Sequence, residues 1–232
     1  SEALPGDSFG SSVSVWGDTA IVGADRRDGG ETDPGSAYLF TRLDGTWTQQ
    51  AKLTASDATA NNRFGESVSL WEDTAVVGAP GDSLGNPDAS GSAYVFTRSG
   101  EFWIQQAKLI ASDATQGDGF GVSVSVWGDT AVVGAHGDDA GAGSAYVFAR
   151  SNGVWTQQAK LTPSDAAAGD RFGVSVSLWG DTAVVGADRN DDSGLDSGSA
   201  YVFTRDGSVW TEQTKLLAPG GAAGDFFGVS VS

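Results

Sequence analysis

Short stretches in which apolar and polar residues alternate recur along the whole chain. Residues 122–126 read Val-Ser-Val-Ser-Val, a period of two that places valines on one face of a strand and hydroxyls on the other. Trp127-Gly128-Asp129 then predicts a tight turn, and residues 130–135 form a second run rich in β-branched residues. Residues 144–150 predict an aromatic third strand, and residues 155–161 predict a polar fourth strand.

This four-stranded unit occurs four times, and its beginning occurs a fifth time. Phe-Gly pairs start at positions 9, 64, 120, 172 and 227, so the spacings by subtraction are 55, 56, 52 and 55 residues. A period near 50 is typical of propeller blades, whereas solenoid rungs are shorter and independent sandwiches are longer. We expect an all-β fold in one domain, residues 1–232: a β-propeller of four-stranded antiparallel blades, about four repeats plus one extra strand. The repeats span approximately 9–63, 64–119, 120–171 and 172–226, with a partial fifth at 227–232.

Small residues and lysines punctuate each unit at fixed places. Asn152-Gly153 and its counterparts favour type I′ turns between the third and fourth strands. The small Gly134-Ala135 ending of the second strand would let a neighbouring layer approach closely. Lysine recurs in the fourth strand, where charge suits an exposed sheet edge, so we expect this strand to be outermost; the positions are 52, 108, 160 and 215.

Composition excludes several classes of function. The formal charge of −17 would repel nucleic acid and anionic lipid. The sequence contains no run of 18 apolar residues, the length that a membrane-spanning helix requires. Cysteine is absent, which excludes disulfides and thiolate metal sites. The lack of methionine indicates a processed form or an excerpt of a longer protein.

The pattern Phe-Gly, Val-Ser-Val, Val-Val-Gly-Ala and Ser-Ala-Tyr-Val-Phe resembles the FG-GAP repeat of integrin alpha chains, most closely its bacterial branch. The resemblance covers essentially the whole chain. It implies a β-propeller, on secreted or cell-surface proteins, with no catalytic activity. The integrin calcium loop lies between the first two strands, but the turns here are only as long as Trp127-Gly128-Asp129, too short to wrap a cation that needs six or more oxygens.

Acidic loops between the second and third strands are the candidate sites. Side-chain oxygens with the spacing of a calcium loop occur in the fourth copy at Asp188, Asn190, Asp192 and Asp196, and in the first copy at Asp25, Asp28 and Asp33. The second and third copies are poorer, with Asp82, Asn86 and Asp88 in one and Asp138 and Asp139 in the other. Ordinary solvated turns use the same residue types, and we favour that interpretation. No cofactor is expected to be required, and calcium is the competing hypothesis.

Other repeated residues are interpreted as structural. A side chain that can accept a hydrogen bond stands two positions before each Phe-Gly pair and suits an Asx turn. These residues are Asp7, Asn62, Asp118, Asp170 and Asp225. Two tryptophan series, 16, 71, 127 and 179 and then 47, 103, 155 and 210, suit packing between blades better than sugar binding. His136 occurs in one copy and lacks a catalytic partner, and no carboxylate pair lies in an apolar context, so no enzyme is predicted.

The sequence therefore predicts a non-enzymatic extracellular adhesion or protein-interaction module. A protein or glycan ligand would bind a rim formed by loops 25–35, 80–91, 136–143 and 188–198. One alternative is a structural assembly unit, a homo-oligomer or part of a longer array, because a closed ring of four blades has no place for a fifth copy of the first strand. Another alternative is a carbohydrate-binding propeller.

Overall fold

The chain forms four antiparallel sheets of four strands, and the strands of each sheet follow one another in chain order. The computed structural model describes residues 8–25, 34–82 and 90–232. The first sheet holds β1 (Phe9–Trp16), β2 (Thr19–Ala24), β3 (Ser36–Leu43) and β4 (Thr46–Leu53), and the second holds β5 (Val68–Trp71), β6 (Thr74–Ala79), β7 (Ser92–Ser99) and β8 (Phe102–Leu109). The third holds β9 (Ser123–Trp127), β10 (Thr130–Ala135), β11 (Ser144–Ser151) and β12 (Val154–Leu161). The fourth holds β13 (Phe172–Trp179), β14 (Thr182–Ala187), β15 (Ser199–Asp206) and β16 (Val209–Leu216). The predicted all-β class is confirmed.

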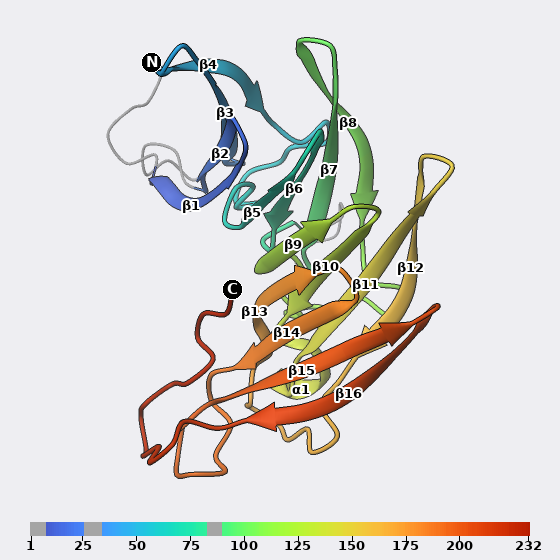
Figure 1. Cartoon of the computed structure of the whole chain (residues 1–232). Helices are drawn as coiled ribbons and strands as arrows, with labels where there is room; N and C mark the ends of the chain where they lie inside the picture. The colour runs from blue at the N-terminus through green and yellow to red at the C-terminus, as the bar shows by residue number, and fades with distance from the viewer. Residues whose placement is uncertain (1–7, 26–33, 83–89) are drawn as a thin grey trace.

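The sheets are arranged as blades around an axis. The first strands β1, β5, β9 and β13 lie side by side, while the fourth strands fan outward (Figure 1). The fourth strand is the outermost of each sheet, as predicted. A short helical turn, α1 (Asp138–Gly141), lies in the loop between β10 and β11, and its Asp139 and Ala140 have positive φ angles of 50° and 61°. In the described ranges, no helix is long and apolar enough to span a membrane.

The hairpin turns have the predicted backbone conformation. Asn152 and Gly153 have φ angles of 50° and 78°, and positive values at both central residues define a type I′ turn. Gly17, Gly128 and Gly180 in the first turns have φ angles of 55° to 57°. Glu72 stands at the same place in the second copy with φ 47°, a conformation that costs a non-glycine residue about 1 kcal/mol.

Apolar residues pack between neighbouring blades rather than inside one. One core joins the first and second blades, a second joins the second and third, and a third joins the third and fourth. In the third core, Val132, Val147 and Leu161 of one blade meet Phe172 and Val176 of the next. Among the described residues no such core joins the fourth blade to the first, so the blades form an open arc (Figure 1).

The Phe-Gly motif locks each blade onto the one before it. Ser123 Oγ in the third blade donates to the carbonyl oxygen of Gly173 at 2.8 Å, and Ser67 and Ser175 make the same bond to Gly121 and Gly228. The backbones approach so closely that a Cβ on Gly134 would lie 1.9 Å from the Gly173 oxygen. The close approach predicted at Gly134-Ala135 is therefore confirmed.

In the outermost strand of each of the first three blades, a bulge directs one glutamine at the next blade. In the third sheet Val147 pairs with Ala159 and Phe148 pairs with Gln157, which leaves Gln158 as the extra residue. Gln158 accepts a hydrogen bond of 3.0 Å from Trp210 Nε1, and Gln106 and Gln50 accept the same bond from Trp155 and Trp103. Trp103, Trp155 and Trp210 of the second tryptophan series therefore join blades, as predicted.

Candidate functional site

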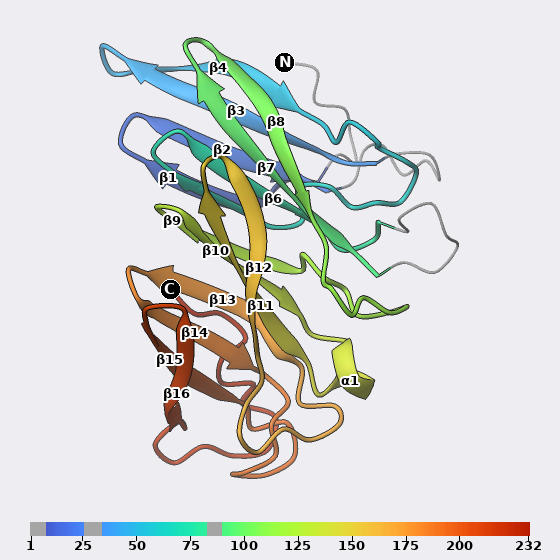
Figure 2. The same cartoon turned by 90° about the vertical axis from the view of Figure 1, so that its right-hand side faces the viewer.

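The blades carry different connections at the two opposite ends of their strands. In the third and fourth blades, the loops between second and third strands, including α1, lie at one end, and the hairpin turns lie at the other (Figure 2). We call them the loop end and the hairpin end. The predicted metal residues of the fourth copy belong to the loop end, and the first tryptophan series belongs to the hairpin end.

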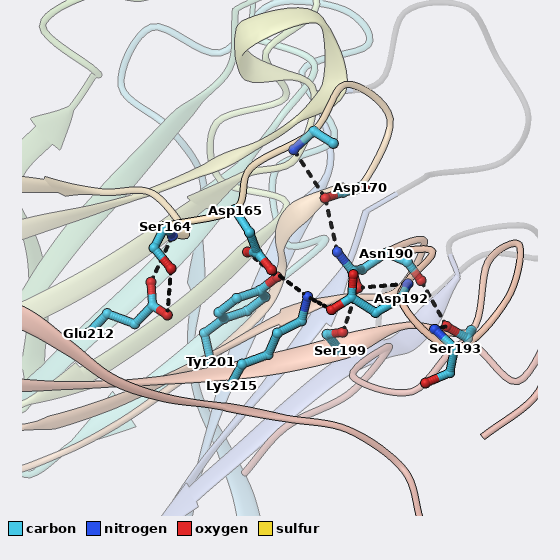
Figure 3. A network of polar contacts seen from close by, with 12 residues as sticks. Ser164, Asp165, Asp170, Asn190, Asp192, Ser193, Ser199, Tyr201, Glu212 and Lys215 are labelled. Carbon is cyan, nitrogen blue, oxygen red and sulfur yellow. Dashed lines mark hydrogen bonds and ion pairs between the residues drawn. The ribbon is translucent and has the colours of Figure 1, made fainter. Parts of the chain in front are cut away.

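The fourth-copy acidic loop is organised by hydrogen bonds to protein groups (Figure 3). Asn190 is buried; its Nδ2 donates to Asp170 at 3.1 Å and its Oδ1 accepts from Ser199 Oγ at 2.8 Å. Asp192 pairs with Lys215 of the outermost strand. These two predicted ligands thus both contact protein groups.

The other two predicted residues of this loop point elsewhere. Asp188 is buried, and its Oδ2 lies 3.4 Å from Arg171 Nη1 while its Oδ1 makes no hydrogen bond. Burial outweighs the arginines nearby and raises the pKa of Asp188. The backbone N–H of Asp196 donates to Asp191 Oδ1 at 2.8 Å. The four residues therefore do not form one coordination shell.

The first-copy loop is described only at its start. Asp25 is buried, with its Oδ2 3.9 Å from Arg63 Nη2, and Asp28 and Asp33 lie outside the described residues. Across the described ranges, no group of three or more acidic or histidine side chains is placed to hold a metal ion. The calcium hypothesis for this loop stays a prediction.

Calcium is expected to leave the melting temperature unchanged, because the described carboxylates are spread over separate protein partners. The measurement is thermal unfolding with millimolar calcium and then with excess chelator. A calcium-dependent rise would contradict this expectation, since ligands that bind only the folded state raise stability. Loss of that rise in Asp192→Asn would assign it to the fourth copy, and loss in Asp28→Asn would assign it to the first.

Lys108, Lys160 and Lys215 of the outer strands each sit in a repeated cluster that the sequence did not reveal. In the second blade, Tyr94 OH donates to Asp57 and Asp82 at 2.8 Å each, and Lys108 Nζ lies 2.5 Å and 2.6 Å from the same two carboxylates. Lys160 and Lys215 stand over Tyr146 and Tyr201 in the same way. The lysine is thus half-buried in an ion cluster, which goes beyond the predicted role of edge protection.

Electrostatics in this cluster favour the charged carboxylates. Burial opposes ionisation of Asp57, but hydrogen bonds from Lys108 and Tyr94 outweigh it and hold the Asp57 pKa below its usual value. Burial and the two carboxylates raise the pKa of Tyr94 far above its usual range, so the phenol stays a donor. The cluster closes a loop onto a blade and leaves no side chain poised for acid–base chemistry.

The acceptor before each Phe-Gly pair is structural, as predicted. Asp118 accepts hydrogen bonds from the backbone N–H and the hydroxyl of Thr115 at 2.6 Å and 2.7 Å. Asp170 and Asp225 accept from the backbone N–H three residues earlier at 3.2 Å and 2.8 Å. Asn62 accepts from the hydroxyl of Thr59 at 2.6 Å, which explains why a neutral amide serves at this place. Asp7 lies outside the described residues.

At the hairpin end, the first tryptophan series forms a stack that crosses the blades. The ring centroids are 3.9 Å apart for Trp16 and Trp71, 3.5 Å for Trp71 and Trp127, and 3.8 Å for Trp127 and Trp179. Neighbouring tryptophans therefore cover the faces of Trp71 and Trp127 that a sugar would need. Trp179, at the end of the stack, keeps 69% of its surface exposed.

Charged hollows flank this stack. A hollow of about 650 Å³ between the first two blades is lined by Trp16, Asp18, Arg42, Glu72 and Arg98, among others. Each arginine is fixed by protein contacts: Arg98 Nε donates to Asp73 at 2.6 Å and the guanidinium lies over Trp103 at 5.7 Å. These contacts fix Arg98 within its own blade, and its Nη1 also donates to Thr19 Oγ1 of the first blade at 3.5 Å.

His136 lies at the loop end, in the loop after β10, and does not suit general-base catalysis. Burial first, and then the charges of Arg171, Arg63 and Arg189, lower the pKa of His136 to about 4. Its Nδ1 is buried without a hydrogen-bond partner. The side chain is neutral near pH 7 and lacks the orienting partner that a base requires.

Comparison with known proteins agrees with the repeat structure. The FG-GAP repeat matches residues 1–40, 47–96, 103–148, 155–203 and 210–232. The matches that start at residues 47, 103, 155 and 210 each begin in the outermost strand of a blade. The first three of these end in the third strand of the following blade, at residues 96, 148 and 203. The family repeat is therefore offset from the sheets. No curated protein matches the chain.

Solved structures show the same fold. The chain is similar to the crystal structure of Saccharomyces cerevisiae Sqt1, with a TM-score of 0.53 and 12% identity over 92% of this chain and 49% of that chain. The chain thus spans about half the length of that protein. Because the family repeat covers most of the sequence, the chain belongs to the FG-GAP repeat family.

Proposed function

We propose that the chain is a non-enzymatic, extracellular adhesion or protein-interaction module that binds a protein partner through its loop end. The FG-GAP repeat fold is typical of protein-interaction propellers, and the extracellular adhesion role is our extension of it. The observation that carries the proposal is that shared residues and variable residues occupy different places in the fold. Side chains shared by the copies are used between or within blades, whereas residues that differ between copies gather in the loops after the second strands.

The fourth-copy loop shows this division most clearly. Asn190 and Asp192 hold the loop against its blade, and Leu195 between them and β15 keeps 70% of its surface exposed. Asp191 and Ser193 beside it are exposed as well. An exposed leucine in an acidic, internally bonded loop can serve as an apolar contact surrounded by a charged rim, the general layout of protein interfaces.

Charge defines the class of partner. With a formal charge of −17, the chain attracts basic protein surfaces and repels polyanions. We therefore expect a ligand with a basic patch around an apolar pocket, bound more weakly as salt is raised.

Leu195→Ala is expected to weaken binding to such a ligand by about tenfold or more, the usual effect of truncating an interface anchor. The measurement is biolayer interferometry against a panel of immobilised extracellular proteins with basic surfaces. Val209→Ala is the matched control, because Val209 is 64% exposed at the hairpin end of the same blade.

Two results would contradict the proposal. Binding that Val209→Ala removes and Leu195→Ala leaves intact would move the site to the hairpin end. Binding to a glycan array that is lost in Trp179→Ala would support the carbohydrate-binding alternative, because Trp179 holds the open end of the tryptophan stack.

A further inference from the structure

The turn between β5 and β6 departs from the repeat at one residue. Gly17, Gly128 and Gly180 hold this place in the other copies, with φ angles of 55° to 57°. The second copy has Glu72 there, with φ 47°. This left-handed conformation suits glycine and strains a residue that carries a Cβ. Strained residues cluster at binding and catalytic sites, so Glu72 is a candidate for a function beyond the turn.

Glu72 lines two of the hollows at the hairpin end. One has a volume of about 650 Å³ and lies between the first and second blades, and the other has about 340 Å³ and lies between the second and third. Blades added at either end of the arc would pack on its outer faces and leave both hollows open. Glu72 is exposed, and among the residues that the structure describes no cation pairs with its carboxylate.

The arginines in the larger hollow are already neutralised by aspartates. Arg42 pairs with Asp18 at 2.6 Å in the first blade, and Arg98 pairs with Asp73 at 2.5 Å in the second. Glu72 adds a carboxylate that has no matching cation. The charged lining therefore consists of three carboxylates and two guanidinium groups, which leaves a net charge of −1. The smaller hollow has the same balance.

The two arginines leave part of each aspartate to a ligand. Arg98 Nε and Nη2 lie 2.6 Å and 2.5 Å from the same oxygen, Asp73 Oδ1. Arg42 contacts Asp18 Oδ1 in the same way, at 2.8 Å and 2.6 Å. The side chains of Asp18 and Asp73 are 67% and 62% exposed, so a ligand can reach the second oxygen, Oδ2, of each. With Glu72, the hollow thus offers acceptors from three carboxylates.

We propose that the hollow between the first and second blades binds a basic side chain, lysine or arginine, of a protein partner. Glu72 supplies the charge that pairs with this side chain, and Oδ2 of Asp18 and of Asp73 accept hydrogen bonds from it. One unpaired carboxylate matches one positive charge. Calcium fits less well, because it needs six or more oxygens, and in the described ranges no group of three or more acidic side chains is placed to hold a metal. The site lies at the hairpin end, so it is separate from the proposed ligand site and does not depend on it.

The size of the hollow favours a peptide segment over a small amine. A volume of about 650 Å³ exceeds that of one lysine or arginine side chain, so the residues beside it would enter the hollow as well. Trp16 and Leu43 in the lining offer apolar contacts to these neighbours. The formal charge of −17 would draw a basic segment toward the chain.

Nuclear magnetic resonance titration of the whole chain tests the site. The probes are the peptides acetyl-Gly-Arg-Gly-amide and acetyl-Gly-Lys-Gly-amide, with acetyl-Gly-Gln-Gly-amide as the neutral control. Saturable shifts are expected at the indole N–H groups of Trp16 and Trp71 and at the amide of Asp73, with the basic peptides alone. Glu72→Gln should weaken binding about three- to tenfold, between the effects of exposed and of desolvated charged pairs. Glu101→Gln is the matched control, because it removes an exposed carboxylate from the other hairpin turn of the same blade.

Two further variants separate a binding role from a structural one. Glu72→Gly should raise the midpoint of urea unfolding by relieving backbone strain, and should weaken peptide binding as much as Glu72→Gln does. Gly128→Glu should add a second binding event in the smaller hollow, which Gly128 lines. A glutamate fits there, because no atom lies within 4 Å of a Cβ placed on Gly128 and Glu72 occupies the equivalent place.

Several results would overturn the proposal. Equal affinity of wild type and Glu72→Gln, or shifts confined to the loop end, would show that the hollow is not the site. A Glu72→Gly variant less stable than wild type would show that the glutamate serves the fold. A small amine such as spermidine that binds more tightly than either basic peptide would overturn the assignment to a protein partner.

Discussion

Gly134→Ala is expected to lower the free energy of unfolding by at least about 3 kcal/mol, the upper range for overpacking a rigid site. A Cβ at this position would lie 1.9 Å from the Gly173 oxygen and 2.3 Å from Ser123 Oγ. The first of these atoms is backbone and cannot move without separating the third and fourth blades. The loss would include the Ser123 to Gly173 hydrogen bond, which is repeated between all neighbouring blades. Urea unfolding followed by tryptophan fluorescence measures the effect.

The control is Gly128→Ala in the turn of the same blade. Gly128 has φ 57°, but no atom lies within 4 Å of a Cβ placed there. Only backbone strain should appear, about 1 kcal/mol. The second copy supports this estimate, since Glu72 occupies the equivalent place with φ 47°. Equal losses in the two variants would show that strain, and not contact between blades, decides the cost at Gly134.

The blades could be predicted from the sequence because their signals are local. Alternation from Val122 to Val126 fixes a strand, and Asn152-Gly153 fixes the turn whose backbone angles the structure shows. The close approach at Gly134 was predictable for the same reason, since a small residue at a strand end leaves room for a neighbour.

The individual partners across blades could not be predicted, because they lie about 50 positions apart in the sequence. Lys108 meets Asp57 at a separation of 51 residues, and Trp155 meets Gln106 at a separation of 49. The bulge that frees Gln106 carries no mark in the sequence, since Gln105 and Gln106 look alike and only one of them faces the next blade.

The candidate metal site shows the same difficulty. Asp192 has the spacing of a calcium ligand, but the residue that decides its role is Lys215, in a strand 23 residues away. The spacing of residues along a loop gives the order of the side-chain oxygens. It does not reveal that a lysine of another strand supplies the positive charge. The open arc was also beyond the sequence, because identical blades fit rings of different size.

Lys160→Met is expected to lower the free energy of unfolding at pH 7 by about 2–4 kcal/mol, because it leaves a buried carboxylate without its partner. Lys160 Nζ lies 2.7 Å from Asp138 Oδ2 and 2.8 Å from Asp113 Oδ2. The Asp138 side chain is 5% exposed, so water cannot replace the ammonium group. The lysine is itself 25% exposed, which places the loss below that of a fully buried pair.

The effect should shrink as pH falls. In wild type, burial opposes ionisation of Asp138, but the interactions with Lys160 and Tyr146 outweigh it and lower its pKa. That stabilisation is present above the unfolded pKa, near 3.8, and is lost as pH falls through the lower folded pKa. Without Lys160, burial raises the Asp138 pKa instead. Protonation of Asp138 in acid then removes an unpaired buried charge from the variant and so stabilises it. In wild type the same protonation removes the ion pair with Lys160 and so destabilises the fold.

Urea unfolding of both proteins between neutral and acid pH tests this argument. The double variant Lys160→Met with Asp138→Asn is the control, because it removes the buried charge together with its partner. It should recover part of the stability lost by Lys160→Met at pH 7 and should flatten the pH dependence. If the double variant is as unstable as the sum of the two single ones, the lysine stabilises the blade through its contact with Tyr146, whose ring centroid is 5.5 Å from Nζ, rather than through charge.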